Sequence, residues 1–418
     1  MSLTADDGTI ARALRAAFAP DPPERVGVAV SGGSDSMALL FLMADWATAG
    51  GPEISAITIN HGLRDEAARE ADAVAEACAR LNVAHDIRLW QGWDGGGNLQ
   101  DQARRARQNL IGEWARDHGI GTVALGHTAD DQAETVLMRL ARAAGVDGLA
   151  AMRLSRVAGG IRWLRPLLDQ RREALRAMLR RRGESWFDDP SNDNEDFERV
   201  RARMVLSQLE PLGLTVEALA ATASRLASAS DALARLTEEK ARAMTIVSNG
   251  DVLIDRDRLL ALPEEVQFRL LAHTLRWVSV AEYRPRQDAI GGLLQAIRDN
   301  RPHVLSGRHV LSGKTLRVTR EFNAVAALTA RPGEVWDRRW RIFGPLDQGY
   351  EVRALGETGL SNCPDWRDSG LPRVSLLASP AIWQGDRLLA APLAGMANGW
   401  CAEHTRDNDD FFTALITH

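Results

Sequence analysis

The stretch that decides the fold is "VGVAVSGGSDSMALLFLM" at residues 26–43. Its first five residues alternate small and β-branched apolar side chains, which is typical of a buried strand. Residues 37–43 are almost all apolar, and the six residues between, "SGGSDS", are too small and flexible to fill a core. This order predicts a strand, a tight glycine-rich turn and the start of a helix.

A turn of this kind suits an anionic ligand. Backbone N–H groups at the positive end of a helix bind phosphate, and the two glycines allow the backbone to approach it closely. Ser31, Ser34 and Ser36 add hydroxyl donors. The lysine of a Walker loop is absent, and Asp35 stands at the head of the helix instead. A carboxylate there favours Mg²⁺ between itself and the phosphate, and the alternative is that Asp35 only caps the helix.

The first 150 residues alternate strand-like and helix-like segments, as in a parallel sheet with crossover helices. The expected strands are residues 26–30, 54–59, 84–89 and 122–126, and the expected helices lie near 35–49, 65–81, 99–118 and 130–144. Between them, the loop at 91–100 holds three consecutive glycines, and we expect it to be mobile and able to close over a ligand.

The rest of the chain is expected to form two further domains. A basic helical stretch at 165–210 is interrupted by the polar loop "DDPSNDNEDFE" at 188–198. Beyond it the pattern predicts helices with one short strand at 251–255, then strands at 304–330, a linker at 329–340 and short strands at 335–418. We therefore predict an α/β catalytic domain with a parallel sheet at 1–212, a mainly helical central domain at 213–332, and a small α+β C-terminal domain at 333–418.

Composition narrows the class of protein. The chain has 418 residues, of which 45% are hydrophobic and 26% charged, as expected for a globular protein of two or three domains. The N-terminus lacks the apolar core of a signal peptide, and no apolar run reaches the roughly 20 residues that span a bilayer, so we expect a cytoplasmic protein with no membrane partner. Cys78, Cys363 and Cys401 lie far apart, which argues against a disulfide scaffold or a structural zinc site.

Positive charge is concentrated although the net charge is −5. The segment 153–182 is rich in arginine and has few acids, and "RVRAR" follows at 199–203. Such clusters are the usual electrostatic sign of a phosphate-rich partner, and charge alone equally allows a solvated helix face.

The loop "SGGSDS" resembles the pyrophosphate-binding loop of the ATP pyrophosphatase (PP-loop) superfamily, whose members cleave ATP between the α- and β-phosphates to adenylate a substrate. Further blocks resemble, in order and spacing, the tRNA(Ile)-lysidine synthetase family, strongly over residues 25–210 and more weakly beyond. These blocks are "INHGLRDEAARE" at 59–70, "NLQDQARRAR" at 98–107, "ALGHTADDQAETVLMRLARAAGVDGLAAM" at 124–152, "RPLL" at 165–168 and "GESWFDDPSNDNEDFERVRAR" at 183–203.

Acidic residues follow the strand expected at 122–126. Asp130, Asp131 and Glu134 would lie at the carboxyl end of a parallel sheet, where open α/β sheets bind ligands. Asp131 would then face Asp35, and the two carboxylates suit Mg²⁺, the alternative being a helix cap and a solvated acid.

The resemblance implies an ATP-dependent ligase that joins free L-lysine to the wobble cytidine of tRNA(Ile), with ATP and Mg²⁺ as cofactors. The residues it implies are Asp35, Asp131, Arg107 and Arg201 in catalysis; Ser31, Gly32, Gly33, Ser34, Asp35, Ser36, His61 and Arg104 in ATP binding; and Asp35 and Asp131 on Mg²⁺. Arg64 and Arg203 accompany His61 and Arg201 in these blocks, and the arginines could meet ATP phosphates or tRNA, or be solvated.

Two positions depart from the family pattern. Gln108 stands where an aromatic residue is usual, and Val200 stands where an asparagine is usual. Both differences bear on contacts with tRNA and leave the ATP loop untouched.

The chain has only two lysines, Lys240 and Lys314, and both lie outside the predicted catalytic domain. The attacking amine is therefore expected to arrive as a free molecule, with Asp130 and Glu134 as candidate anchors for its α-ammonium group. The alternatives are another adenylating enzyme, such as a tRNA thiolase, and a non-catalytic RNA-binding protein. A thiolase needs reactive cysteines, whereas Cys78 is expected to be buried. The oligomeric state is left open, with a homodimer as one alternative.

Overall fold

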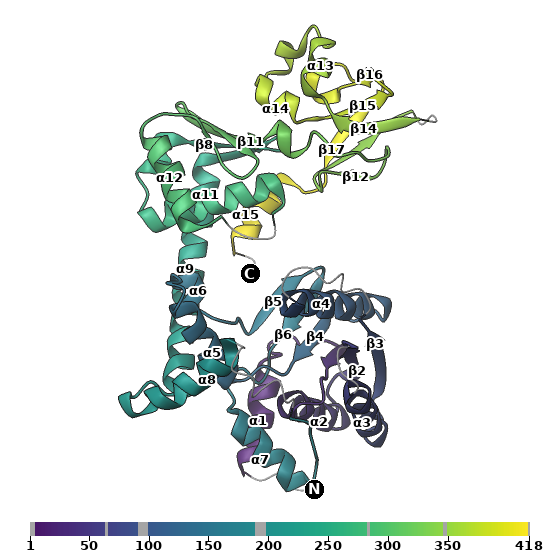
Figure 1. Cartoon of the computed structure of the whole chain (residues 1–418), viewed down its shortest axis with the longest axis vertical. Coiled ribbons are helices and arrows are strands. Elements are labelled where there is room, and N and C mark those ends of the chain that lie inside the picture. The colour runs from purple at the N-terminus through teal and green to yellow at the C-terminus, as the bar shows by residue number, and fades with distance from the viewer. Residues whose placement is uncertain are drawn as a thin grey trace. The chain divides into compact units, whose positions relative to one another are not determined.

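The computed structural model describes residues 5–62, 66–90, 99–188, 198–281, 285–345 and 349–416 (Figure 1). They form two compact units, Met1–Ser230 and Asp231–Thr417. The boundary falls within α9 (Val216–Met244). The division into three domains stays a prediction.

The first unit is built on a six-stranded sheet in the order β3-β2-β1-β4-β6-β5. All neighbouring pairs are parallel except β5 and β6, which form an antiparallel hairpin at one edge. The four predicted strands are confirmed to within one residue at each end, and with them the α/β fold class. The strands are β1 (Arg25–Ala29), β2 (Glu53–Asn60), β3 (Ala84–Leu89), β4 (Thr122–Leu125), β5 (Ser155–Ala158) and β6 (Ile161–Leu164).

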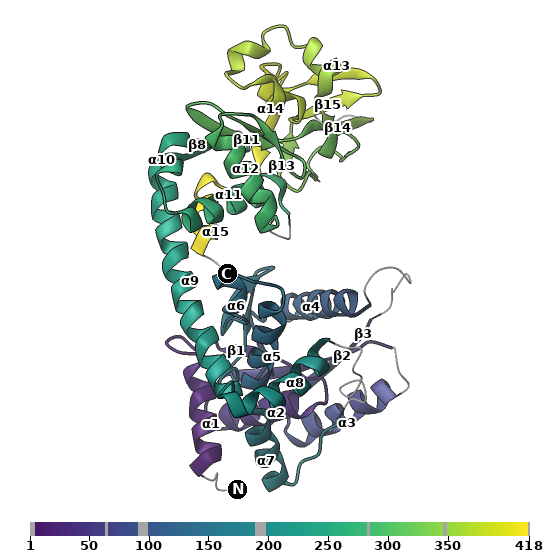
Figure 2. The same ribbon diagram turned by 60° about the vertical axis from the view of Figure 1, so that its left-hand side comes forward.

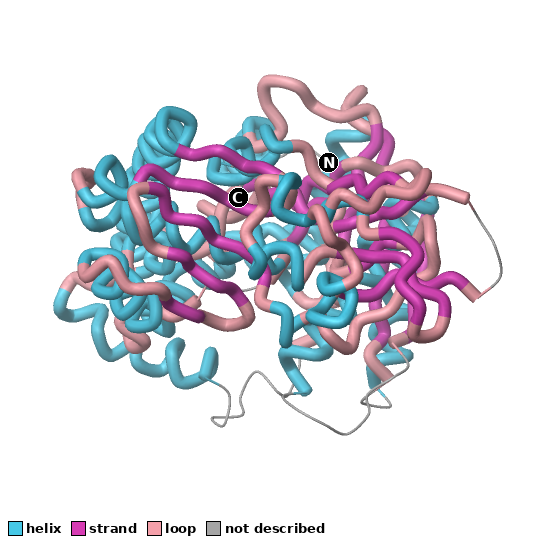
Figure 3. The backbone as a smooth tube through the Cα atoms, turned by 90° about the horizontal axis from the view of Figure 1, so that it is seen from above, coloured by secondary structure: helices cyan, strands magenta, loops and turns pink. Residues whose placement is uncertain are grey.

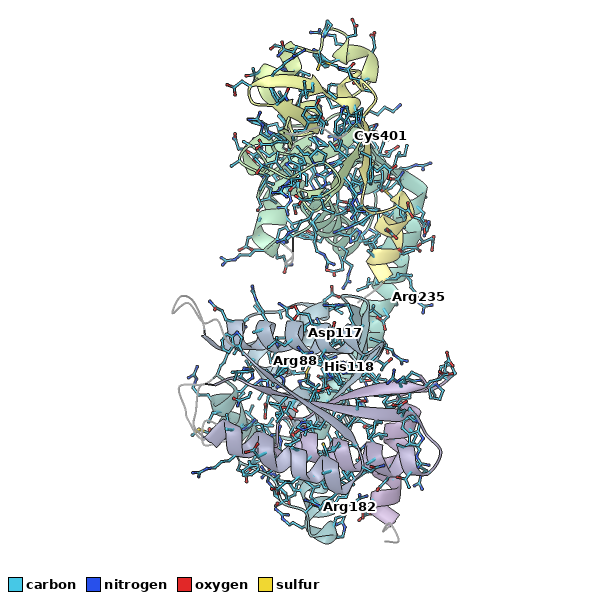
Figure 4. All side chains as sticks on the ribbon, turned by 90° about the vertical axis from the view of Figure 1, so that its right-hand side faces the viewer. Arg88, Asp117, His118, Arg182, Arg235 and Cys401 are labelled. Atoms are coloured by element: carbon cyan, nitrogen blue, oxygen red, sulfur yellow. The ribbon has the colours of Figure 1, made fainter. Side chains whose placement is uncertain are left out.

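Helices cover both faces of this sheet, which explains why β1 is apolar and buried after its first residue, Arg25 (Figures 1 and 2). One face carries α1 (Ala5–Ala16), α2 (Ser34–Thr48), α3 (Glu66–Arg80) and α7 (Arg172–Arg182), whose apolar side chains share one core with β1 and β2. The other face carries α4 (Leu99–Asp117), where the buried Trp114 packs against Val123 and Trp163. At its end, Asp117 forms an ion pair of 3.5 Å with Arg88 of β3, beside it in Figure 4.

The hairpin of β5 and β6 falls in a region for which the sequence predicted no strands. Its turn is Gly159-Gly160, with φ of +61° and +76°. Two consecutive glycines between short apolar runs are a hairpin signal, because both turn positions need positive φ. The described part of the unit also contains α5 (Ala129–Leu140), α6 (Val146–Leu149) and α8 (Glu198–Leu209). Residues of α5, α8 and α9 form a separate apolar cluster.

The second unit holds a five-stranded sheet and two three-stranded sheets, drawn in magenta with the other strands in Figure 3. The strands are β7 (Thr245–Ser248), β8 (Asp251–Asp255), β9 (His303–Val304), β10 (Arg308–Leu311), β11 (Thr315–Arg320), β12 (Val335–Trp336), β13 (Trp340–Phe343), β14 (Tyr350–Ala354), β15 (Pro380–Gln384), β16 (Arg387–Ala390) and β17 (Cys401–His404). The helices are α10 (Arg256–Leu260), α11 (Glu264–Ser279), α12 (Gln287–Arg298), α13 (Gly356–Ser361), α14 (Arg373–Leu377) and α15 (Asn408–Ile416). The strand predicted at 251–255 is confirmed as β8.

The linker predicted at 329–340 is wrong. This stretch contains β12, and Trp336 and Trp340 are buried in a core cluster. Buried tryptophans remove a large apolar area from water, and so they fix the segment against the rest of the unit. The Pro-Gly pair of this segment had suggested a linker. Near the C-terminus, Phe411 of α15 packs in the same core as Leu270 of α11. None of the described helices is long and apolar enough to cross a membrane.

Candidate active site

A pocket of about 660 Å³ opens at the carboxyl ends of β1 and β4 in the first unit. This is the edge at which open α/β sheets bind ligands. Its lining comes from the β1–α2 loop and the start of α2, from the β4–α5 connection and the start of α5, and from α4, α7, the segment after α7, and α8. The pocket lining includes Ser31, Gly33, Ser34, Asp35, Ser36, Arg107, Gly126, His127, Asp131, Arg172, Arg176, Phe187, Val200 and Arg203.

The β1–α2 loop is held in a tight turn by its own small residues. Gly32 adopts a φ of +87°, a backbone conformation that residues with a side chain rarely adopt. The backbone N–H of Ser31 donates to Ser36 Oγ at 3.0 Å, and Ser36 Oγ donates to the carbonyl of Gly33 at 3.0 Å. Gly33 is the N-cap of α2, and no side chain caps this end. The alternative that Asp35 caps α2 is therefore wrong, and the helix N-terminus faces the pocket without a side-chain acceptor.

A glycine after β4 lets the two strand ends approach each other. A Cβ atom at Gly126 would lie 2.9 Å from the carbonyl oxygen of Asp35 and from the backbone nitrogen of Ser36. Any side chain here would therefore push the β4–α5 connection, which leads into the first turn of α5 with Asp131, away from the first turn of α2, which carries Asp35. Gly126 lies in the block that resembles the family, but the pattern of the sequence alone gave it no role.

The guanidinium of Arg172, on the first turn of α7, joins three carboxylates. Its Nε donates to Asp35 Oδ2 at 2.9 Å, its Nη2 to Asp131 Oδ1 at 2.9 Å, and its Nη1 to Glu134 Oε1 at 3.4 Å. The other oxygen of Asp131 accepts from the backbone N–H of Thr128 at 2.9 Å and completes a capping box at the start of α5. The capping alternative for Asp131 thus holds for one oxygen, while the second oxygen faces the same cation as Asp35.

Burial and charge set the protonation of this group. Burial works against ionisation of Asp131, but the charge of Arg172 and the hydrogen bond from Thr128 keep the pKa of Asp131 below its usual value. For Asp35, burial outweighs Arg172 and raises the pKa of the carboxyl. Burial also lowers the pKa of His127 to about 3, so this imidazole is neutral near pH 7.

The structure brings most of the predicted site residues together. Ser31, Gly33, Ser34, Asp35, Ser36, Asp131 and Arg107 line the pocket, and Gly32 lies within the same loop. His61 does not line it; the ring of His61 lies 5.8 Å from that of Trp90, and burial together with the charge of Arg107 lowers the pKa of His61. Arg104 is exposed on α4, one helical turn before Arg107.

On α8, Arg203 lines the pocket and pairs with Glu134 at 2.5 Å, whereas Arg201 is exposed and is not among the lining residues of the described chain. Val200 also lines the pocket. Arg64, the glycine loop at 91–98 and the polar loop at 189–197 lie outside the described residues. The roles of all these residues stay predictions.

Besides Gly126 and His127, the sequence analysis missed the pocket residues Arg172, Arg176 and Phe187. The two arginines lie in an arginine-rich run, where nothing in the pattern separates them from their neighbours. Phe187 is 40% exposed, and its backbone N–H donates to the carbonyl of Gly32 at 3.0 Å. This hydrogen bond connects the segment after α7 to the β1–α2 loop.

Asp35 and Asp131 suit a hard divalent cation. Both present a carboxylate oxygen to one position, where the guanidinium of Arg172 supplies the positive charge. Among the described residues, no group of three or more histidines, cysteines or acids could hold a metal ion. Two protein carboxylates, with water and phosphate oxygens as further ligands, are the arrangement that Mg²⁺ usually takes with nucleotides.

The parallel sheet, the uncapped glycine loop and the paired carboxylates at the strand ends define a nucleotide-utilising protein of the PP-loop class, and residues 7–210 match the PP-loop domain family. Over 419 residues, and 100% of both chains, the sequence is 46% identical to a tRNA(Ile)-lysidine synthase of Ruegeria pomeroyi. It is 32% identical over 381 residues, 88% of each chain, to a tRNA(Ile)-lysidine synthase of Wolbachia pipientis. The chain belongs to the tRNA(Ile)-lysidine synthase family.

Proposed function

We propose that this chain is an ATP-dependent ligase that joins free L-lysine to the 2-position of the wobble cytidine of tRNA(Ile), forming lysidine and releasing AMP and pyrophosphate. The observation that carries the proposal is the pair Asp35 and Asp131, which face one cation position beside an uncapped helix N-terminus. Membership of the family supports the choice of substrates. A location in the cytoplasm and a homodimeric state stay predictions.

In the first step, the 2-carbonyl oxygen of the cytidine attacks the α-phosphorus of ATP, and pyrophosphate leaves. The loop at residues 31–36 and the N-terminus of α2 bind the leaving pyrophosphate through backbone N–H groups. Arg107 and Arg176 line the same pocket and add positive charge to it. Mg²⁺ held by Asp35 and Asp131 would supply further charge neutralisation on the phosphates.

The cytidine must leave its stack to reach this pocket. Phe187 offers an exposed aromatic ring in the pocket lining, next to the loop that binds phosphate. We propose that the extruded base packs against Phe187, because base–aromatic stacking is worth about 1–3 kcal/mol per base.

In the second step, the amine of lysine attacks C2 of the adenylated base and AMP leaves. Both lysines of the chain, Lys240 and Lys314, lie in the second unit, so neither is part of this pocket's unit. Of the two candidate anchors, Asp130 already accepts from the backbone N–H of Arg172 at 2.8 Å. Glu134 keeps one buried oxygen, Oε2, without a hydrogen-bond partner among the described residues. The Glu134 side chain is only 1% exposed and is not among the pocket-lining residues of the described chain, so both candidate anchors stay predictions.

The test is incorporation of labelled lysine into a tRNA(Ile) transcript, with the modified nucleoside identified by mass. We expect product only when ATP, tRNA and lysine are all present, and none with ornithine or arginine. Asp35→Asn serves as the inactive control. Product with ammonia or sulfide donors but not with lysine would refute the proposal in favour of another adenylating enzyme. RNA binding without pyrophosphate release would instead favour a non-catalytic RNA-binding protein.

A further inference from the structure

The β5–β6 hairpin brings two arginines to the face of the sheet that α4 covers. Arg156 pairs in register with Trp163, and Trp163 shares a core cluster with Trp114 of α4. The backbone N–H of Arg165 donates to the carbonyl of Leu154 at 2.8 Å and extends the hairpin by one bond. Since α4 also carries Arg104 and Arg107, four arginines gather here. We refer to Arg104, Arg107, Arg156 and Arg165 as the arginine cluster.

The arginine cluster has no carboxylate counter-ion in the described part of the chain, because no Asp or Glu there forms an ion pair with any of its four members. Arg165 is only 7% exposed, and its Nη1 donates to the carbonyl of Arg153 at 2.8 Å. Its Nε has no acceptor among the residues that the structure describes. The buried Nε of Arg156 also has none. Burial, with the nearby charges of Arg156 and Arg104, lowers the pKa of Arg165 to about 10. Buried donors and charges of this kind are costly unless an anion satisfies them.

The neighbouring arginines on α7 are different. Arg180 pairs with Glu173 at 2.7 Å, Arg182 pairs with Asp45 at 2.6 Å, and Arg181 pairs with Asp7. The basic segment 153–182 therefore divides in two. Its helical part is neutralised by acids of the chain itself, and its hairpin part keeps unsatisfied positive charge.

We propose that the arginine cluster binds backbone phosphates of the substrate RNA beside the reacting base; this rests on the proposed function. Arg107 belongs to both the cluster and the pocket wall, so the two sites are continuous. Arg156 lies on β5, three strands away from β1 in the sheet order, so the two strands lie roughly 14 Å apart across the sheet. That offset suits the next phosphates of an RNA strand, and arginine forks bind phosphate oxygens in pairs.

The test compares Arg156→Gln and Arg104→Gln with Arg162→Gln in the full chain. Arg162 lies on β6 and pairs with Val157 rather than with Arg156, and its Nε is satisfied by Ser155 Oγ at 3.2 Å. Dissociation constants are measured for a tRNA(Ile) transcript over a series of KCl concentrations, and for ATP. For the two cluster variants we expect RNA affinity to fall at least about fivefold and the slope of log K against log salt to decrease by about one. For Arg156→Gln, ATP affinity should stay within about twofold of the wild type. Arg162→Gln should change neither.

Loss of ATP affinity with normal RNA affinity would overturn the proposal and make the cluster part of the nucleotide site. Cluster variants that bind RNA like Arg162→Gln would also overturn it. Arg104 is exposed, so its variant tests the idea even if Arg156→Gln unfolds. The proposed function fails separately, if wild-type protein binds RNA through Arg156 but incorporates no lysine.

Discussion

Replacing Arg172 with methionine tests the charge balance of the candidate active site. Methionine keeps much of the apolar stem and removes the guanidinium that joins Asp35, Asp131 and Glu134. Glu134 retains Arg203, but Asp35 and Asp131 lose their cation with side chains only 16% and 9% exposed. Breaking a buried pair by removing one partner costs about 3–5 kcal/mol. For a unit of this size we expect the unfolding temperature to fall by about 10 °C in EDTA.

The loss should depend on pH and on Mg²⁺. Without Arg172 the folded-state pKa values of the two buried carboxyls lie above their unfolded values, so their penalty is small at pH 4 and grows as pH rises to 8. Mg²⁺ should restore part of the stability, because it supplies the missing positive charge.

The assay is thermal unfolding of the full chain, with hydrogen exchange on peptides of α2 and α5 to assign the loss to the first unit. The matched control is Arg180→Met, which breaks an ion pair whose side chains are 55% and 68% exposed and should therefore lower the unfolding temperature far less. The reasoning is refuted if Arg172→Met is as stable as Arg180→Met at pH 8 in EDTA.

Three further outcomes are expected. Asp35→Asn should fold normally and lose at least about 100-fold in lysidine formation, because the amide keeps the size but not the charge that holds Mg²⁺; near-normal turnover would contradict the metal role. His127 has a pKa of about 3 in the folded protein, so below pH 6.5 only the unfolded chain binds a proton at this residue. Between pH 7 and pH 5 the wild type should therefore lose about 2 kcal/mol of unfolding free energy that His127→Gln does not lose. Parallel plots of stability against pH for the two proteins would argue against this. Ellman's reagent should label the exposed Cys401 (Figure 4) in the native protein and should label Cys78 and Cys363 only after unfolding. Both of these cysteines are buried, and burial raises the pKa of Cys78 to about 11. Fast labelling of two or more thiols in the native protein would contradict the structure.

Local sequence predicted the elements that hold the nucleotide loop. The family, the α/β fold class and the ligase function are confirmed, and the strand, glycine turn and apolar helix at 26–43 lie where the pattern indicated. These features depend on neighbours in the chain: alternating apolar residues form a strand, and a run of apolar residues forms a helix that is buried on all sides. The prediction that Asp131 faces Asp35 also succeeded, because consecutive strand ends of a parallel sheet meet at one edge.

Other features were decided only by the tertiary structure. The sequence gives no sign that Arg172, rather than another arginine of its run, pairs with Asp35, since the two lie 137 residues apart. It likewise does not show that Arg180 to Arg182 are neutralised by acids while Arg156 and Arg165 are not. Local periodicity determines which segments become strands and helices, but the partner of a charge depends on which distant segments pack together. The apolar cores bring these segments together, and that packing decides which arginines find a carboxylate and which are left for a ligand.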